Sequence, residues 1–365
     1  MNNSTFLITC SDEFQGAAWA ELKQIDPRLE KGETLAPGLF LISSLHDEAS
    51  LAGLVEFGQP IYVRHLFPVQ AVIELDESPA DLAQLSARAV EQARAEDRQA
   101  GDRFSVQARL IEGIPHTYNT FAIKEAIVAA LTTTLGLQEN IKAPEYVVSV
   151  VYAEKKAYLG FSRPEQNLSD WAGGMRHYAK RPEQISRAEF KLLEALEVFN
   201  LDLPKTGTVL DLGAAPGGWS RVLLEAGLRV IAVDPAALDP RLYIPGLEHY
   251  RGHAEEFLRR AEREDRRFDL ICNDMRMDAL VAAGLMADFA RLLTPAGLAL
   301  TSLKLPHETK KLKPHTLVLR ALTLLKQSYS EVHARQLFHN RQEVMVLLRN
   351  PRPSISEKHH NQSVK

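Results

Sequence analysis

The chain has 365 residues, 45% of them apolar and 25% charged, which is the balance of a folded protein with more than one domain. Its net charge of -4 argues against a protein that coats nucleic acid along its whole surface, although local basic patches stay possible. Two cysteines are too few for a disulfide framework or a cysteine-based zinc site, and no apolar run is long enough for a membrane helix. We therefore expect a cytoplasmic protein that is neither secreted nor membrane-spanning and holds no metal.

The first part of the chain mixes strands and helices without regular alternation. Strands are predicted over residues 5–9, 38–43, 61–67 and 103–110, with one more strand and turn over 145–159. Helices are predicted over 12–25, 80–98 and 121–135. This pattern indicates an α+β region, which we divide into a small N-terminal domain at 1–48 and a second domain at 49–165.

The stretch from Arg163 to Ile185 loses the periodicity and contains Gly173-Gly174 and two prolines. Glycine and proline clusters of this kind are typical of connections between domains. We therefore assign residues 166–185 to an interdomain linker and place the next domain at 186–350.

Strands and helices alternate after the linker, which predicts an α/β domain with a doubly wound, Rossmann-like parallel sheet. The predicted elements are a helix from Arg187, strand 209–213, a helix from Gly217, strands 229–234, 248–251 and 268–274, helix 279–293 and strand 298–305. A helix at 316–327 and strands at 331–338 and 343–348 then predict an antiparallel hairpin at the sheet edge. Residues 351–365 are short and polar and are predicted to be a disordered tail.

A glycine-rich loop follows the first strand of this sheet, where residues 211–219 read Asp-Leu-Gly-Ala-Ala-Pro-Gly-Gly-Trp. Ligands of such sheets lie at the carboxyl ends of the strands, and glycines let the backbone approach them closely. A loop for a dinucleotide would read G-x-G-x-x-G, whereas this one places a proline after Ala215. We therefore predict S-adenosylmethionine as the cofactor, with loop contacts from Gly213, Ala215, Pro216, Gly217, Gly218 and Trp219.

Asp234 ends the next strand, at the place where a carboxylate holds ribose hydroxyls in nucleotide-binding folds. The alternative interpretation is an aspartate that only caps the turn after a strand. Together with the loop and the strand order, Asp234 favours a methyltransferase.

Four polar residues are predicted to converge above the same sheet. Lys191 lies in the helix before the first strand, Asp274 ends the fourth, Lys304 ends the fifth and Glu343 opens the last. Asp274 or Glu343 alone could be an ordinary carboxylate at a strand end or edge strand. A lysine within Thr301-Ser-Leu-Lys-Leu305 is harder to explain in that way, because central strands seldom hold a charge without a partner.

These residues and the loop resemble the FtsJ (RrmJ) family of RNA ribose 2′-O-methyltransferases over about residues 180–350. The resemblance implies a Lys-Asp-Lys-Glu catalytic tetrad, with Lys304 as general base. Leu303-Lys-Leu-Pro306 and Ala334-Arg-Gln-Leu-Phe-His339 are similar to the RlmM-like branch, which methylates a cytidine of 23S ribosomal RNA. The resemblance further implies a ferredoxin-like N-terminal domain and a THUMP-like RNA-binding domain at 49–165. It also implies that Ser186 contacts the cofactor, although Ser186 could be only a helix N-cap.

The chemistry of a ribose hydroxyl explains why a base is needed. Its pKa lies well above neutral, so the oxygen attacks a methyl group efficiently only as its proton leaves. A lysine can accept that proton if burial and a second lysine disfavour its charged form. We assign the tuning role to Lys191, and we expect Asp274 and Glu343 to orient the ammonium groups and relay protons.

One position departs from the family pattern. The family commonly has an acidic residue after the third strand, near the adenine, whereas this chain reads Tyr250-Arg-Gly-His253-Ala-Glu255. His253 takes that place or Glu255 moves into it, and the sequence leaves the adenine contact open.

Basic residues flank the predicted site on two stretches and suit an RNA path. The candidates for RNA binding are Arg176, Lys180, Arg181, Arg187, Lys310, Lys311 and Lys313. Tyr178 lies within the first stretch and could stack on an unpaired base. The alternative is a solvated linker and helix start.

Three other functions compete with this hypothesis. A guanine N-methyltransferase would carry Asn/Asp-Pro-Pro-aromatic where this chain has Asn273-Asp-Met-Arg276. A non-catalytic RNA-binding or ribosome-assembly protein would be free to lose Lys304, and a small-molecule O-methyltransferase would not need the paired lysines. The sequence leaves open which nucleotide is methylated, whether free RNA or a ribosomal particle is the substrate, and the oligomeric state, for which a monomer is compatible.

Overall fold

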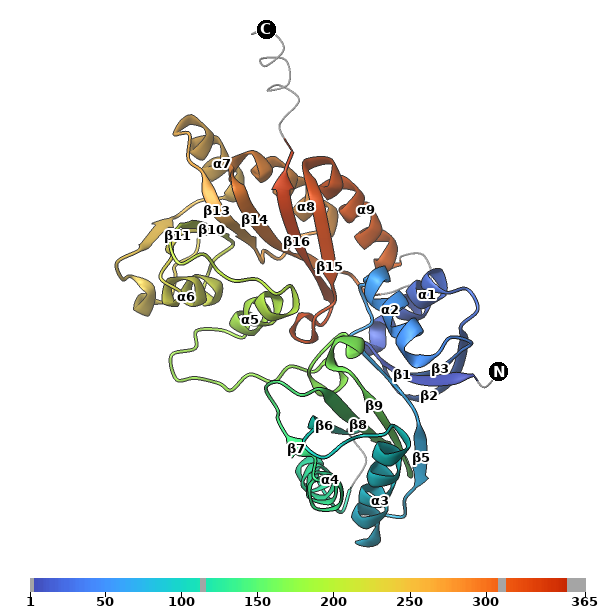
Figure 1. The fold of residues 1–365 in the computed structure, drawn as a ribbon. Coiled ribbons are helices and arrows are strands. Elements are labelled where there is room, and N and C mark those ends of the chain that lie inside the picture. Colours follow the sequence, from blue (N-terminus) through green and yellow to red (C-terminus); the bar gives the residue numbers. More distant parts are fainter. Residues whose placement is uncertain (1–2, 112–115, 308–312, 353–365) are drawn as a thin grey trace, which may run out of the picture. The chain divides into compact units, whose positions relative to one another are not determined.

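Two units make up the chain, Met1–Arg176 and His177–Lys365. The computed structural model describes residues 3–111, 116–307 and 313–352 (Figure 1). The boundary between the units falls inside the stretch 166–185 that we predicted as a linker.

The first unit begins with a four-stranded sheet in the order β2-β3-β1-β4. Its elements are β1 (Ser4–Thr9), η1 (Asp12–Phe14), α1 (Gln15–Ile25), β2 (Glu30–Ala36), β3 (Leu39–Ser44), α2 (Glu48–Gly58) and β4 (His65–Pro68). Because β4 pairs with β1, with Leu7 opposite Phe67, this sheet extends to Pro68 and not to residue 48 as predicted. Helix α2 begins where Asp47 accepts a hydrogen bond from Ser50 N at 2.8 Å, an N-cap that the prediction missed.

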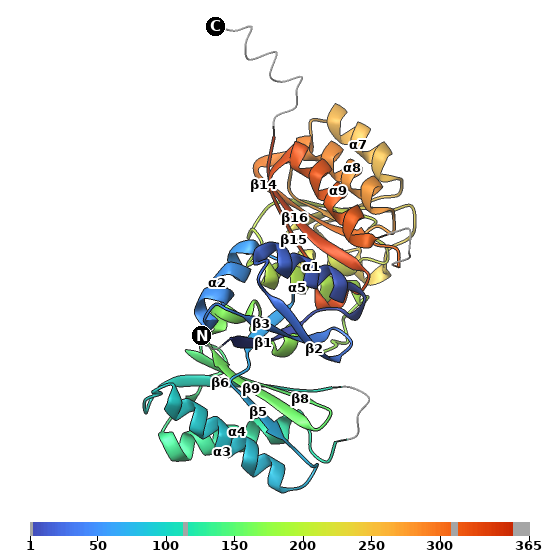
Figure 2. The ribbon, with the colours of Figure 1, turned by 90° about the vertical axis from the view of Figure 1, so that its right-hand side faces the viewer.

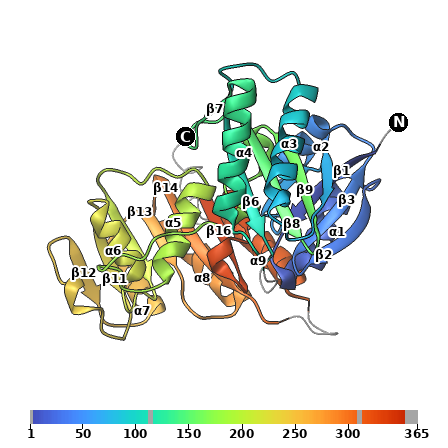
Figure 3. The same ribbon diagram turned by 90° about the horizontal axis from the view of Figure 1, so that it is seen from below.

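The second sheet of this unit has the order β5-β9-β8-β6-β7. It comprises β5 (Ala71–Glu74), β6 (Arg103–Leu110), β7 (Gln138–Glu139), β8 (Tyr146–Ala153) and β9 (Lys156–Ser162), with helices α3 (Ala80–Ala95) and α4 (Thr120–Leu135). The two helices lie side by side on one face (Figure 3), where Leu85 and Ile127 pack with Val148 and Val150. On the other face, Val151 and Tyr158 share a core with Leu7 and Phe67 of the first sheet, so the two sheets are one packed body.

The glycine pair of the predicted linker belongs to this first unit. The short turns η2 (Pro164–Asn167) and η3 (Ala172–Gly174) pack against its sheets, and Asn167 is fully buried. Gly174 has φ +66°, and a Cβ there would lie 2.9 Å from Arg64 O. The glycines therefore permit a close approach to β4, and Arg163–Arg176 is part of the packed unit.

The second unit contains a seven-stranded sheet in the order β12-β11-β10-β13-β14-β16-β15. Its strands are β10 (Thr208–Leu212), β11 (Arg229–Val233), β12 (Leu247–Tyr250), β13 (Phe268–Asn273), β14 (Leu293–Lys304), β15 (Tyr329–Arg335) and β16 (Glu343–Pro351). Its helices are α5 (Ala188–Val198), α6 (Gly218–Glu225), η4 (Pro240–Leu242), α7 (Ala254–Arg263), α8 (Ala279–Phe289), η5 (Ala290–Leu292), α9 (Pro314–Ser328) and η6 (Phe338–Asn340). Helices α7, α8 and α9 line one face of the sheet (Figure 2), and α5 and α6 pack on the other.

This topology confirms the predicted doubly wound parallel sheet. Strand β10 pairs in parallel with both β11 and β13, so the strand order reverses at β10, where ligands of such sheets bind. Strand β16 lies between β14 and β15 and is antiparallel to both, as the predicted hairpin requires. Helix α7 was not predicted, and β16 extends through Pro351; residues 353–365 of the predicted tail lie outside the described residues.

Candidate active site

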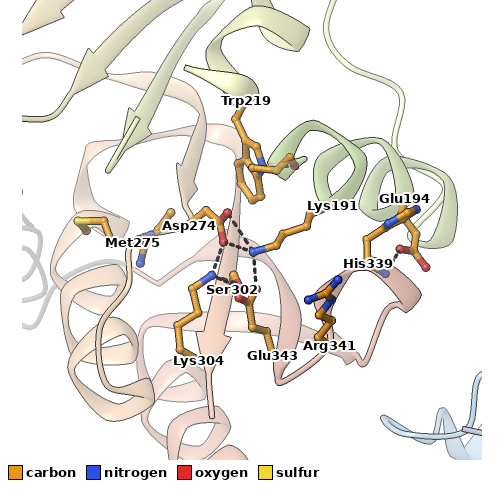
Figure 4. Close-up of polar contacts among 12 residues, drawn as sticks. Lys191, Glu194, Trp219, Asp274, Met275, Ser302, Lys304, His339, Arg341 and Glu343 are labelled. Atoms are coloured by element: carbon orange, nitrogen blue, oxygen red, sulfur yellow. Dashed lines mark hydrogen bonds and ion pairs between the residues drawn. The ribbon is translucent and has the colours of Figure 1, made fainter. Parts of the chain in front are cut away.

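The four predicted tetrad residues come from four elements and meet at one end of the sheet (Figure 4). Lys304 is the last residue of β14 and pairs directly with Glu343, the first residue of β16. Lys191 Nζ lies 2.7 Å from Glu343 Oε2 and 3.3 Å from both oxygens of Asp274. Lys304 Nζ lies 2.9 Å from the same Glu343 oxygen and also contacts Asp274 Oδ1. Each lysine thus contacts both carboxylates.

The charges of the tetrad stabilise one another in a partly buried place. The four side chains are only 14–18% exposed, so each charge loses part of its hydration. Burial disfavours the ammonium of Lys191, but the negative charges of Asp274 and Glu343 outweigh it and raise the pKa of Lys191. Burial likewise opposes ionisation of Glu343, but Lys304 and Lys191 prevail and lower the pKa of Glu343. Lys191 is therefore a cation at neutral pH and offsets part of the negative charge of the two carboxylates.

Glu194 fixes the turn that leads into Glu343, a role that the sequence did not reveal. It lies one turn after Lys191 on α5 and is 1% exposed. Its two carboxylate oxygens accept hydrogen bonds from Phe338 N at 2.7 Å and from His339 N at 2.9 Å. The same helix therefore carries Lys191 and anchors η6, the turn before β16. The sequence shows a glutamate on the apolar side of a helix, which indicates a buried role. Its partners could not be predicted, because they lie 144 and 145 residues further along the chain.

The glycine-rich loop lies against the residue that follows Asp274. Gly213 and Gly217 have φ of +71° and +112°, which other residues rarely adopt. A Cβ on Gly213 would collide with Met275 Cγ, so glycine is needed for the loop to reach the end of β13. The loop and the tetrad are thus neighbours.

Asp234 binds this loop with one carboxylate oxygen and its own turn with the other. Oδ2 accepts a hydrogen bond from Ala215 N at 3.0 Å and Oδ1 accepts one from Ala236 N at 2.8 Å. The side chain is half-buried, so its remaining lone pairs stay accessible. A carboxylate here attracts ribose hydroxyls and repels phosphate, so the residues present fit a nucleoside cofactor such as S-adenosylmethionine.

Three of the other predicted cofactor residues lie in different settings. The indole of Trp219 is 3% exposed, donates to Ala188 O at 2.8 Å and joins the core under α5, and the predicted cofactor contact of Trp219 stays a prediction. Ser186 Oγ accepts from Ala188 N at 3.3 Å, as an N-terminal cap would, and lies so close to Gly218 that a Cβ there would collide with it. His253 is exposed at the start of α7, and its adenine contact stays a prediction.

A histidine that the sequence analysis passed over lies closer to Asp234. His249 Nε2 is 3.0 Å from Asp234 O, and its Nδ1 is 3.1 Å from the hydroxyl of Tyr243. His249 stands on β12 opposite Ala232, two residues before Asp234. It therefore supports the backbone of the strand end that carries Asp234.

The predicted RNA-binding residues divide into three groups. Arg176 is 7% exposed and pairs with Asp170 at 3.0 Å, so its predicted contact with RNA is corrected to a structural role in the first unit. Lys180, Arg181, Arg187 and Lys313 are exposed. Lys310 and Lys311 lie outside the described residues.

Aromatic rings lie next to the tetrad elements. The ring centroids of Tyr178 and Phe190 are 5.6 Å apart, and that of His339 lies 5.6 Å from Tyr178 and 5.2 Å from Phe190. The three rings join the entry to α5 with the turn before β16.

The described residues offer neither a metal-binding group nor a membrane-spanning helix. They contain no group of three histidine, cysteine or acidic side chains arranged to hold a metal ion. No helix among them has both the length and the apolar composition needed to cross a membrane.

The second unit is similar in sequence to a known protein family. Residues 184–346 match the family described as FtsJ-like methyltransferase. Proteins named ribosomal RNA large subunit methyltransferase M are similar to the chain: one from Halorhodospira halophila is 34% identical over 49% of this chain and 51% of its own length. The protein from Azotobacter vinelandii is 31% identical over 62% of this chain and 64% of its own length. The protein from Pseudomonas aeruginosa is 25% identical over 95% of this chain and 99% of its own length. In the first two alignments the chain spans between 51% and 64% of the relatives' length.

Among solved structures, TrmN from Thermus thermophilus is similar over 94% of this chain and 99% of its own, with 18% identity and a TM-score of 0.39, a likeness too low to support an assignment. The family match covers the loop and the whole tetrad. The second unit of this chain is thus similar to FtsJ-like methyltransferases over residues 184–346.

Proposed function

We propose that this chain transfers a methyl group from S-adenosylmethionine to a ribose 2′-hydroxyl of RNA. The proposed substrate is a cytidine of the 23S RNA of the large ribosomal subunit, either free or in an assembly intermediate. The observation that carries the proposal is the convergence of Lys191, Asp274, Lys304 and Glu343 beside the Gly213 loop. The printed names of the relatives support ribosomal RNA as the substrate class.

The two lysines of the tetrad have distinct tasks in this reaction. S-adenosylmethionine supplies, when bound, an electrophilic methyl group on a sulfonium. Lys304 Nζ, as a neutral amine, accepts the proton of the 2′-hydroxyl while the hydroxyl oxygen bonds to the methyl carbon, whose bond to sulfur breaks and leaves a neutral thioether. Lys191 stays charged and balances Asp274 and Glu343, which would otherwise favour the protonated form of Lys304.

Methylation of a base is disfavoured by the surroundings of Asn273. Its side chain is fully buried: Nδ2 donates to Thr301 Oγ1 at 3.2 Å, and Oδ1 accepts from Met275 N at 3.0 Å. An enzyme that methylates an exocyclic amine needs acceptors at this strand end to hold that amine. Asn273 is instead engaged within the fold, and Asp274 with the two lysines.

The path of the RNA is proposed from charge and from the domain order. The exposed residues that would neutralise phosphates of the RNA lie in the segment leading into α5 and at the start of α9: Lys180, Arg181, Arg187 and Lys313. The THUMP-like part of the first unit, which contains the sheet β5-β9-β8-β6-β7, binds a further part of the RNA. This substrate places the work of the protein in the cytoplasm, where bacterial ribosomes are assembled.

The experiment that tests the proposal follows the labelled methyl group. The purified protein is incubated with methyl-tritiated S-adenosylmethionine and unmodified large-subunit ribosomal RNA, and the RNA is then hydrolysed with alkali. A 2′-O-methyl group blocks cleavage at its own nucleotide, so we expect the label in dinucleotides. Label in mononucleotides would refute ribose methylation. Mapping of ribosomal RNA from cells with and without the gene gives the position, and an unchanged map would refute this substrate.

A further inference from the structure

Ser302 is the polar neighbour of the tetrad to which neither the sequence nor the family comparison gave a role. It lies on β14 two residues before Lys304, so both side chains project from the same face of the sheet. It is 1% exposed. Its Oγ donates a hydrogen bond to Glu343 Oε2 at 2.7 Å and accepts one from Lys304 Nζ at 2.9 Å (Figure 4). The hydroxyl therefore links the base to the carboxylate.

The number of hydrogens on Lys304 makes this link significant. Lys304 Nζ contacts three acceptors: Asp274 Oδ1, Ser302 Oγ and Glu343 Oε2. An ammonium group has three hydrogens and can donate to all of them, whereas a neutral amine has two hydrogens and one lone pair. When Lys304 is neutral, one of the three contacts must therefore lose its hydrogen, and the lone pair takes that direction.

Either carboxylate can release Lys304, because each also contacts Lys191. Lys191 Nζ lies 3.3 Å from both oxygens of Asp274 and 2.7 Å from Glu343 Oε2. Ser302 is fixed by burial, and its own hydrogen is committed to Glu343, so it stays an acceptor and cannot donate into the lone pair of Lys304. Ser302 therefore retains one of the two amine hydrogens, and the lone pair of Lys304 faces a carboxylate and not the strand.

We propose that Ser302 is a positioning residue that turns the lone pair of Lys304 away from the strand, toward the carboxylates and the reacting hydroxyl. Ser302 takes part in no bond that forms or breaks. It holds one N–H of the base in place through its hydroxyl, and that hydroxyl is held in turn by Glu343. This inference rests on the proposed function, because it assumes that Lys304 is the base.

The test compares removal of the hydroxyl with its retention. In Ser302→Ala, the amine of Lys304 is free to rotate, and we expect kcat to fall about 10- to 100-fold with unchanged KM for RNA and S-adenosylmethionine. The protonated form also loses an acceptor, so the acidic limb of the kcat pH profile should move to lower pH. Ser302→Thr keeps a hydroxyl on a strand that tolerates β-branched residues, and should restore most of the activity.

A matched control lies at the other end of the same strand. Thr294 Oγ1 donates to Asp269 Oδ1 at 3.3 Å, so Thr294→Val also removes a bond from a hydroxyl to a carboxylate on β14. We expect this variant to keep kcat and its pH profile. Equal losses in Ser302→Ala and Thr294→Val would reduce Ser302 to a structural role and overturn the proposal.

A second measurement does not depend on turnover. Lysine side chains labelled with ¹³C are titrated by NMR in the protein without cofactor, and the Lys304 signal is assigned by its loss in Lys304→Arg. Ser302→Ala should move the midpoint of that signal to lower pH, whereas Thr294→Val should not. An unmoved midpoint with unchanged kcat in Ser302→Ala would refute the inference while ribose methylation by the wild-type protein stands. Absence of ribose methylation by the wild-type protein would instead refute the proposed function.

Discussion

The two units of the molecule each bury a basic side chain, and they treat its charge in opposite ways. In the first unit His65 is 1% exposed on β4, and burial, followed by the positive charge of Arg109, lowers the pKa of His65 to about 3. In the second unit Lys191 is also withdrawn from water, yet Asp274 and Glu343 raise its pKa. A buried base without a nearby carboxylate becomes neutral, whereas one with two carboxylates stays charged. The presence of carboxylate partners thus distinguishes the charged tetrad around Lys191 from the neutral, structural His65.

The largest expected effect comes from removal of the proton acceptor in the second unit. Lys304→Ala should lower kcat about 10²- to 10⁴-fold, the usual contribution of a general base, while calorimetry shows S-adenosylmethionine binding within a few-fold of the wild type. Lys326→Ala, which removes an exposed lysine on α9, should leave both unchanged. Substantial turnover by Lys304→Ala would show that the charged cluster contains no base.

The next effect tests whether Lys191 acts through its charge. In Lys191→Gln the two carboxylates act on Lys304 alone, so its protonated form is favoured. We expect kcat at neutral pH to fall about 10²-fold and the acidic limb of its pH profile to move to higher pH. Lys191→Arg keeps the charge and should leave the limb near its wild-type position. An unmoved limb in Lys191→Gln would mean that Lys191 only fills space.

A smaller effect should follow from loosening the turn that positions Glu343. Glu194→Gln weakens two hydrogen bonds from backbone to carboxylate in a buried place, and charged bonds of this type contribute about 1.5–3 kcal/mol. We expect the free energy of unfolding to fall by about 2 kcal/mol and kcat to fall about tenfold, with S-adenosylmethionine binding retained. Glu197→Gln, an exposed position on the same helix, serves as the control. If Glu194→Gln loses stability but not activity, the turn does not set the position of Glu343.

The tetrad could be predicted from the sequence because its geometry follows from strand order. Asp274 and Lys304 end neighbouring parallel strands, and such ends meet at one edge of a sheet. Ser302 could also have been found, since its spacing of two from Lys304 places both on one face. Glu194 could not, because the bonds that give it a role join α5 to a turn far along the chain. Arg176 was misassigned because composition shows a positive charge but not the local pairing with Asp170 that buries it.

The smallest effect concerns stability alone and tests the other half of the comparison. The pKa of His65 falls from 6.5 to about 3 on folding, so between these values the unfolded chain binds a proton that the folded chain excludes. The stability from this group is therefore present above pH 6.5 and is lost as pH falls toward 3, by about 1.4 kcal/mol per pH unit at the steepest. His65→Gln should remove that slope in urea unfolding at pH 7, 6, 5 and 4, whereas His253→Gln, at an exposed position, should keep it. Equal slopes in the wild type and His65→Gln would mean that His65 retains its proton in the folded protein, and the contrast with Lys191 would then fail.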